Sequence, residues 1–139
     1  MTEKEREDKA LAIQTEGFCC AQAVLGALQD LTGLDYETSL AVAAGFGSGC
    51  GTGELCGALS GAVMAIGLAD PFTNGADQGK KKEIRTETQR CLCTFQDKYG
   101  CVTCRELVGK AKRRRCPEYV AYCAALAAEI INDEKEKQL

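Results

Sequence analysis

Apolar residues recur at helical spacing along most of the chain. From position 20 onward they fall at i, i+4, i+7, i+8 and i+11, which places them on one face of a helix. The residues of this stripe are Cys20, Val24, Ala27, Leu28 and Leu31. The segment 80–99 has a second stripe with helical spacing. No segment shows the alternation of apolar and polar residues that is typical of a half-buried strand, so the pattern predicts an all-α protein.

Short polar or glycine-containing connectors divide the chain into seven predicted helical segments. Their approximate ranges are 3–16, 19–31, 35–44, 54–68, 80–99, 102–108 and 117–133. Asp35 is a candidate N-cap, Gly100 suits the position after a helix, and Pro117 suits the first turn of one. The charged tail 133–139 is expected to fray. A chain of this length can bury a substantial core, so we predict that residues 1–139 form a compact single-domain bundle of five to seven helices.

A glycine-rich loop, residues 45–53, precedes the most apolar predicted helix, 54–68. This helix has almost no polar face, so we expect it to be buried on most sides, with Gly57 and Gly61 allowing another helix to approach closely. The glycines match neither the dinucleotide fingerprint nor the P-loop, and no strand precedes them. A phosphate at this helix N-terminus is therefore the weaker alternative. We expect the loop to be a tight turn that brings Cys56 near other thiols.

Composition narrows the chemistry, because the chain has ten cysteines and no histidine. Without histidine, a Ser-His-Asp triad, a Cys-His dyad, a His-ligated haem and a Cys/His zinc site are excluded. The net charge of −3 argues against a general nucleic-acid-binding protein. Residues 1–9 contain no apolar signal-peptide core, and the apolar run 55–69 is shorter than the roughly 20 residues of a membrane span. We therefore expect a cytoplasmic protein with no membrane segment, whose cysteines have redox or metal-binding roles.

Four cysteines fall at or within the first turn of a predicted helix. They are Cys20, Cys56, Cys104 and Cys116. Backbone N–H groups and the positive end of the helix dipole stabilise a thiolate at such a position. A thiolate is both the nucleophile of disulfide exchange and a metal ligand. If these helix ends converge, they form one site of up to four activated thiols; the alternative is that the cysteines are small core residues.

Three further cysteines are secondary candidates for the same site. Cys19 adjoins Cys20 and is a possible substitute for it. Cys50 lies in the glycine-rich loop, from which its thiol can reach the region of Cys56. Cys101 forms a C-x-x-C pair with Cys104 at a predicted helix start. No βαβ pattern surrounds this pair, which disfavours a thioredoxin fold.

A zinc module built from Cys91, Cys93, Cys101 and Cys104 is disfavoured by helix geometry. Two residues along a helix correspond to about 200° of rotation, so the thiols of Cys91 and Cys93 do not face one site. Cys91 is therefore expected in the core. The core is also the default expectation for Cys93 and Cys123.

Four sequence segments together resemble one family. They are Gly-Phe-Cys-Cys-Ala-Gln-Ala-Val at 17–24, Cys-Gly-Ala-Leu-Ser-Gly at 56–61, Cys-Arg-Glu-Leu-Val-Gly at 104–109 and Cys-Pro-Glu-Tyr-Val at 116–120. The chain resembles the C_GCAxxG_C_C family of small redox proteins over most of its length, although it has Cys-Gly-Ala where the family label has Gly-Cys-Ala. The resemblance implies a helical cytoplasmic protein with a redox role and no established substrate. The family's cysteines correspond to Cys20, Cys56, Cys104 and Cys116.

The resemblance also bears on cofactors. Some relatives are joined to haem domains and have been linked to iron–sulfur centres. Haem attachment does not carry over, because this chain has no histidine. No cofactor is certain from the residues, and an iron–sulfur cluster stays open.

The residues leave three functions open. In the first, a thiol-dependent oxidoreductase, Cys20 or Cys56 attacks a disulfide or an oxidant, and Cys104 or Cys116 resolves the mixed disulfide. In the second, these four cysteines hold an iron–sulfur cluster that transfers electrons. In the third, the protein is a non-catalytic helical partner module with its cysteines in the core.

The identity of a partner is less constrained than the chemistry. The first two functions need a redox partner protein, which the residues do not identify. The basic run 110–115 is interpreted as a solvated connector, with an acidic partner or stabilisation of nearby anionic thiolates as alternatives. The Ala- and Gly-rich helix surfaces are compatible with a homo-oligomer.

Overall fold

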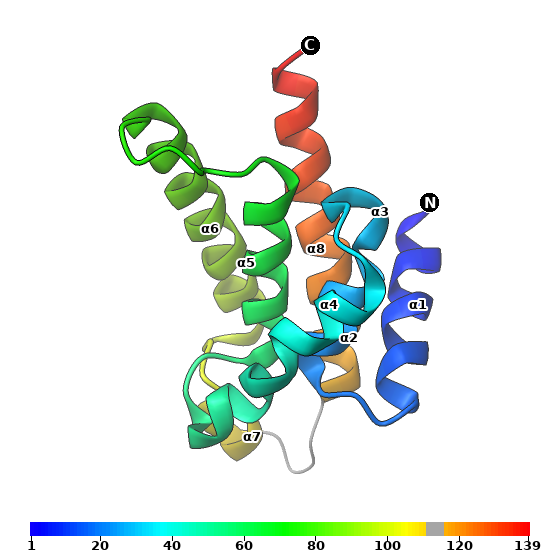
Figure 1. The fold of residues 1–139 in the computed structure, drawn as a ribbon. Helices are drawn as coiled ribbons and strands as arrows, with labels where there is room; N and C mark the ends of the chain where they lie inside the picture. The colour runs from blue at the N-terminus through cyan, green and yellow to red at the C-terminus, as the bar shows by residue number, and fades with distance from the viewer. Residues whose placement is uncertain (111–115) are drawn as a thin grey trace.

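The computed structural model describes residues 1–110 and 116–139, and α-helices dominate both stretches (Figure 1). The helices are α1 (Glu3–Thr15), α2 (Cys20–Ala27), α3 (Gln29–Thr32), α4 (Tyr36–Ala43), α5 (Gly57–Ala69), α6 (Gln78–Tyr99), α7 (Cys104–Lys110) and α8 (Cys116–Lys137). Two short helical turns, η1 (Ala44–Phe46) and η2 (Gly49–Gly53), occupy the glycine-rich loop. Within the described residues the only β pairing is an isolated bridge between Leu55 and Thr103. The prediction of an all-α protein is confirmed.

Helix α5 lies at the centre of the bundle and packs against α2, α6 and α8 (Figure 1). Its closest neighbour is α2, because Gly61 has no side chain to separate the two helices. A Cβ at Gly61 would lie 2.7 Å from the carbonyl oxygen of Ala21 and 3.0 Å from the Cβ of Val24. Ala58, Leu59 and other residues of α5 are buried. The expectations of a buried helix and of a close approach at Gly61 are therefore confirmed.

The predicted helix boundaries differ most from the structure at three places. The segment predicted at 19–31 is divided into α2 and α3, because the backbone of Leu28 leaves helical geometry (φ −106°, ψ 14°). Helix α5 begins at Gly57 rather than near Glu54, since the residues before it pair with another part of the chain. Helix α8 extends to Lys137, so most of the tail expected to fray is helical.

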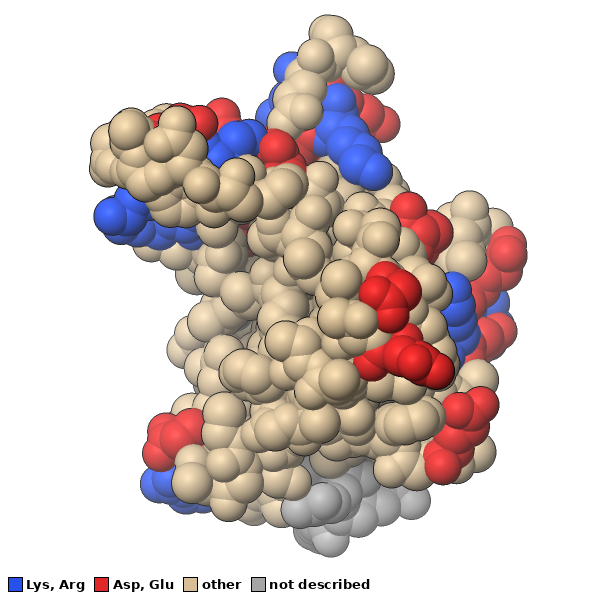
Figure 2. Space-filling view, in the orientation of Figure 1, with Lys and Arg blue, Asp and Glu red and all other residues tan. Residues whose placement is uncertain are grey.

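One end of the bundle carries a group of charged side chains. Here α5 ends, α6 begins and α8 reaches its C-terminal part (Figure 1). Lys80 forms ion pairs with Asp70 (2.5 Å) and Glu83 (3.0 Å), and Gln138 donates a hydrogen bond to Asp70 (2.9 Å). Figure 2 shows Lys, Arg, Asp and Glu gathered over this end, whereas the surface over α5 is largely uncharged. No helix in the described part of the chain is long and apolar enough to cross a membrane.

Candidate functional site

The four cysteines singled out by the sequence all lie at helix starts. Cys20, Cys104 and Cys116 are the first residues of α2, α7 and α8, and Cys56 is the N-cap of α5. Figure 1 shows α7 and the starts of α5 and α8 at the same end of the bundle. The predicted helix positions of the four cysteines are therefore confirmed. We call this part of the molecule the cysteine end.

The four helix starts surround one cavity of about 390 Å³. Five cysteines line this cavity: Cys19, Cys20, Cys56, Cys104 and Cys116. Most of the remaining wall is apolar, with Gln14 and Ser48 as polar members, and no charged side chain of the described residues contributes to it. We call it the cysteine cavity. The structure thus brings together the four primary candidates and one of the three secondary ones.

Backbone pairing between two distant segments positions Cys56 beside Cys104. The N–H of Cys56 donates to the carbonyl of Val102 (2.9 Å), and the N–H of Cys104 donates to the carbonyl of Glu54 (2.7 Å). These bonds flank the bridge between Leu55 and Thr103. Residues 56 and 104 are diagonal neighbours on the same face of the bridge, where side-chain positions are about 7–8 Å apart. The start of α5 and the start of α7 therefore present their thiols to the same space.

Two glycines make room for the vicinal cysteines at the start of α2. A Cβ at Gly57 would overlap the sulfur of Cys20 and would lie 2.8 Å from the carbonyl oxygen of Phe46. A Cβ at Gly47 would lie 2.7 Å from the Cβ of Cys19. The Cys20 sulfur therefore lies against Gly57, which is the first residue of α5 and directly follows Cys56. The glycine pattern therefore serves close contact between cysteines and backbone rather than a phosphate.

The loop also turns as tightly as its glycines predict. Gly49 has a φ of 61°, and a Cβ there would overlap the backbone of Glu54. Ser48 and Cys50, which flank Gly49, also have positive φ values, 54° and 58°. Such values are uncommon for residues other than glycine. The turn brings the N–H of Ser48 to the sulfur of Cys20.

Burial, rather than the helix start, decides the ionisation of the two innermost cavity thiols. Burial raises the pKa of Cys20, although the N–H groups of Ser48 and Ala21 donate to its sulfur. Burial likewise raises the pKa of Cys56 to about 12, although N–H groups in the first turn of α5 donate to its sulfur and act in the opposite direction. The expectation that these helix starts hold activated thiolates is therefore wrong for Cys20 and Cys56. Their sulfurs lose more solvation on burial than the few N–H groups restore.

Cys19 differs from its neighbour Cys20 in its hydrogen bonds. Its sulfur lies 3.8 Å from the carbonyl oxygen of Ala43 and 3.9 Å from that of Ala44, so the thiol donates. The Cys20 sulfur instead accepts from backbone N–H groups. Donation to a carbonyl requires a protonated thiol, whereas accepted N–H bonds favour a thiolate. The two adjacent sulfurs therefore have different hydrogen-bond partners, and that of Cys20 accepts from the N–H groups of Ser48 and Ala21.

The other secondary candidates lie outside the cavity. Cys50 is exposed and Cys101 is buried, and neither lines the cavity. Cys91 and Cys123 are completely buried, as expected for core residues. Cys93 is exposed, so the default expectation of a core position is wrong for it. The contrast between Cys91 and Cys93 follows the rotation of about 200° between them.

No tight metal site forms among the thiols as the structure places them. Within residues 1–110 and 116–139, no three Cys, Asp or Glu side chains are close enough to hold a single metal ion. The zinc module that helix geometry disfavours is also inconsistent with burial, because Cys91 is buried and Cys93 is exposed. The basic run lies largely outside the described residues.

The cavity wall also includes Tyr119, which sequence reasoning missed although it follows Cys116 by one helical turn.

Comparison with known families identifies the chain. A family model described as "Putative redox-active protein (C_GCAxxG_C_C)" matches residues 18–130. The chain belongs to this family. The match spans all four helix starts of the cysteine end. Searches of curated proteins and of solved structures found no match to the chain.

Proposed function

We propose that this member of the C_GCAxxG_C_C family is a dithiol–disulfide redox protein whose reacting pair is Cys20 and Cys56. The observation that carries the proposal is the position of the Cys20 sulfur against Gly57, directly beside Cys56. The Cys20 thiol also contributes electrostatically to the raised pKa of Cys56. A disulfide needs Cβ atoms about 3.8 Å apart, so its formation requires the side chains of Cys20 and Cys56 to approach to that distance. Cys104 and Cys116 then serve as further thiols of the cavity.

The degree of burial assigns the order of reaction. Cys20 is half-buried and lines the cavity, so a disulfide that enters can reach it. Cys56 is only 6% exposed and has the higher barrier to ionisation, with a pKa of about 12. Cys20 therefore attacks first, and Cys56 resolves. N–H donation from Ser48 and Ala21 stabilises the Cys20 thiolate at the moment of attack.

The reaction reduces a disulfide on a redox partner protein. The Cys20 thiolate attacks one sulfur of the partner disulfide, the partner S–S bond breaks, and the second partner sulfur leaves as a thiolate that takes up a proton. Cys56 then attacks the Cys20 sulfur of the mixed disulfide, and the first partner sulfur leaves in the same way. The partner gains two electrons and two protons, and the protein is left with a Cys20–Cys56 disulfide.

A test of this proposal compares oxidised and reduced protein by disulfide mapping. Glutamyl endopeptidase cleaves after Glu16, Glu37 and Glu54 and so places Cys20, Cys50 and Cys56 on separate peptides. Mild oxidation with oxidised glutathione should link the Cys20 peptide to the Cys56 peptide. Cys56→Ala should abolish that link, whereas Cys50→Ala, at an exposed thiol outside the cavity, should leave it intact. A protein whose Cys20 and Cys56 both stay reduced through the oxidation would disprove the proposal.

A second candidate function, electron transfer by an iron–sulfur cluster, is favoured by the space between the thiols. The donor set is of the right kind, because thiolates are the usual ligands of such clusters. The thiols are too far apart for a single ion but surround a cavity of about 390 Å³. In that case Cys20, Cys56, Cys104 and Cys116 would hold the cluster, which would supply one-electron transfer. The N–H groups that donate to Cys20 and Cys56 would stabilise ligand sulfur in the same way.

Anaerobic purification separates the two candidates. A cluster gives absorbance above about 300 nm together with stoichiometric iron and sulfide, and both should disappear in a Cys56→Ala variant. A colourless protein that stays free of iron after anaerobic reconstitution excludes the cluster.

A further inference from the structure

Cys123 is a completely buried thiol of α8, the helix whose first residue lines the cysteine cavity. It follows Cys116 by seven residues along α8. Seven residues make almost two full turns, so the two cysteines lie within about 20° of each other around the helix axis. Cys116 lines the cavity on this face, and Cys123 lies about 10 Å further along the helix axis. The side chain of Cys123 has no exposed surface. The face of α8 that carries Cys116 at the cavity therefore carries a second thiol, Cys123, in the core.

The helices that carry the proposed redox pair both pack against α8. Contacts join α8 to α5, which begins at Cys56, and to α2, which begins at Cys20. Cys56 and Cys123 belong to the same buried core cluster. Among the thiols around Cys123, Cys56 has the strongest electrostatic effect on it, ahead of Cys91 and Cys20. Cys56 thus interacts electrostatically with a cavity thiol, Cys20, and with a core thiol, Cys123.

We propose that Cys123 is a third redox-active cysteine, which attacks Cys56 in the Cys20–Cys56 disulfide and forms a buried Cys56–Cys123 disulfide. This inference rests on the proposed function, because the Cys20–Cys56 disulfide is its starting material. The S–S bond between Cys20 and Cys56 breaks, and a new one forms between Cys56 and Cys123. The proton of the Cys123 thiol ends on Cys20, so no electrons enter or leave.

The exchange moves the oxidised state away from solvent. Cys20 returns to the cavity as a thiol, while the disulfide lies between two residues that are 6% and 0% exposed. External thiols reach a disulfide only by contact with one of its sulfurs, and of this pair only Cys56 borders the cavity, so the inner disulfide is reduced more slowly than the Cys20–Cys56 disulfide. Burial also raises the pKa of Cys123 well above its ordinary value, which makes the exchange slower than the first oxidation. The protein would therefore keep its oxidised state after the partner has left.

The test follows the disulfides of the full chain over time after a pulse of oxidised glutathione. Cleavage after Glu118 and Glu129 places Cys123 on its own peptide, separate from those of Cys20 and Cys56. Early samples should contain the Cys20–Cys56 link. Late samples should contain mostly the Cys56–Cys123 link, with Cys20 again open to alkylation. Fragmentation of the peptide that holds Cys19 and Cys20 assigns the linked residue.

Variants identify the thiol that does the exchange. Cys123→Ala should stop at the Cys20–Cys56 disulfide, which external dithiothreitol should then reduce at least tenfold faster than the late disulfide of the unchanged protein. Cys91→Ala removes another completely buried thiol and Cys93→Ala an exposed one, and neither should alter the time course. These two variants control for general loosening of the core.

The outcomes separate this inference from the proposed function. A Cys20–Cys56 disulfide that persists in the unchanged protein while Cys123 stays a thiol overturns the inference and leaves the proposed function intact. Absence of any disulfide at Cys20 or Cys56 overturns both. Because the time course in the unchanged protein decides these outcomes, the test does not depend on the folding of Cys123→Ala.

Discussion

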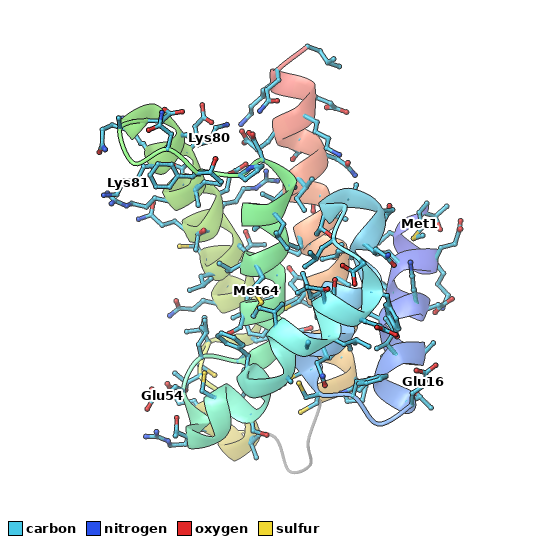
Figure 3. All side chains as sticks on the ribbon, in the orientation of Figure 1. Met1, Glu16, Glu54, Met64, Lys80 and Lys81 are labelled. Atoms are coloured by element: carbon cyan, nitrogen blue, oxygen red, sulfur yellow. The ribbon has the colours of Figure 1, made fainter. Side chains whose placement is uncertain are left out.

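The two ends of the bundle bury ionisable groups in opposite chemical settings. The cysteine end holds thiols around a cavity that has no charged side chain among its described lining residues. The other end, which we call the charged end, holds an ion-pair network and a buried carboxyl group. Its members are Asp70, Lys80, Glu83, Glu87 and Glu134. Figure 3 shows Lys80 at the charged end and Glu54 near the cysteine end.

Burial raises the pKa at both ends but has different consequences for stability. The pKa of Cys56 rises to about 12, and that of Glu87 rises through burial and the negative charges of Glu134, Asp70 and Glu83. A thiol is already neutral at pH 7 in the unfolded chain, so a higher pKa costs no stability there. A carboxyl group is ionised in the unfolded chain at pH 7, so its burial does cost stability. The fold can therefore hold several buried thiols at one end more readily than one buried acid at the other.

The largest expected effect is a loss of stability in alkaline solution caused by the buried thiols. Burial raises the pKa of Cys56 and of Cys91 from 9.0 to about 12. Between these values the folded protein keeps protons that the unfolded chain releases, so stability falls as the pH rises. Each thiol should lower the free energy of unfolding by about 1.4 kcal/mol per pH unit above pH 9. Urea unfolding of reduced protein between pH 8 and 10 measures the slope.

The Cys91→Ala variant isolates one thiol in this measurement. Its slope above pH 9 should be shallower than that of the unchanged protein by about 1.4 kcal/mol per pH unit. Cys93→Ala, which removes an exposed thiol of the same helix, should leave the slope unchanged. Equal slopes for all three proteins would contradict the comparison of the two ends.

The next effect concerns the contact that holds the redox pair together. Gly57→Ala places a methyl group on the Cys20 sulfur and close to the backbone of Phe46, so the start of α5 must shift. We expect a loss of about 1–3 kcal/mol in the free energy of unfolding, as for other overpacked sites. The yield of the Cys20–Cys56 disulfide should change as well. Thermal and urea unfolding measure the first effect, and disulfide mapping measures the second.

Gly67→Ala is the matched control in the same helix. No atom lies within 4 Å of a Cβ at this position, and Gly67 has helical backbone geometry. The substitution should therefore raise stability by up to about 1 kcal/mol, because alanine is the better helix former. A loss at Gly67 as large as that at Gly57 would show that the contact with Cys20 is not the cause.

At the charged end, Glu87→Gln should increase stability at neutral pH. Because the pKa of Glu87 is raised in the folded protein, its contribution is favourable at low pH and is lost as the pH rises. Removing the charge should raise the free energy of unfolding by about 1 kcal/mol at pH 7. The gain should disappear near pH 4, where the glutamic acid is protonated in both states. Glu83→Gln, at a more exposed position of α6, should show no such gain.

The smallest effect is expected for the lysine of the same network. Lys80→Met removes the ion pairs with Asp70 and Glu83, whose side chains are 37% and 55% exposed. We expect a loss of about 0.5–1 kcal/mol, since partly exposed pairs contribute little. The pKa of Asp70, which Lys80 lowers, should rise, and NMR titration would detect this. Lys81→Met is the control, because Figure 3 shows Lys81 pointing away from this network.

Local pattern was sufficient to predict the helices and the position of the key cysteines on them. Asp35 caps α4 through a hydrogen bond from the N–H of Thr38 (3.0 Å), and Gly100 ends α6 with a φ of 85°. The 3.6-residue period also puts Cys91 and Cys93 on different faces of α6, although the default expectation of a core position for Cys93 was wrong. Each of these features depends on residues within one or two turns of each other, so the sequence alone contains them. The start of α5 was misplaced because a distant segment holds residues 54–56.

Only the tertiary structure decided what the cysteines share and how they ionise. Residues 54–56 and 102–104 pair across a long stretch of sequence, and Gly57 and Gly61 bring α5 against α2, so the helix starts meet around one cavity. The sequence by itself determined that each primary cysteine lies at or within the first turn of a helix, which suggested lowered thiol pKa values. The fold reversed that expectation for Cys20 and Cys56. The reason is physical: a helix start acts on a thiol locally, whereas desolvation depends on everything that packs around it.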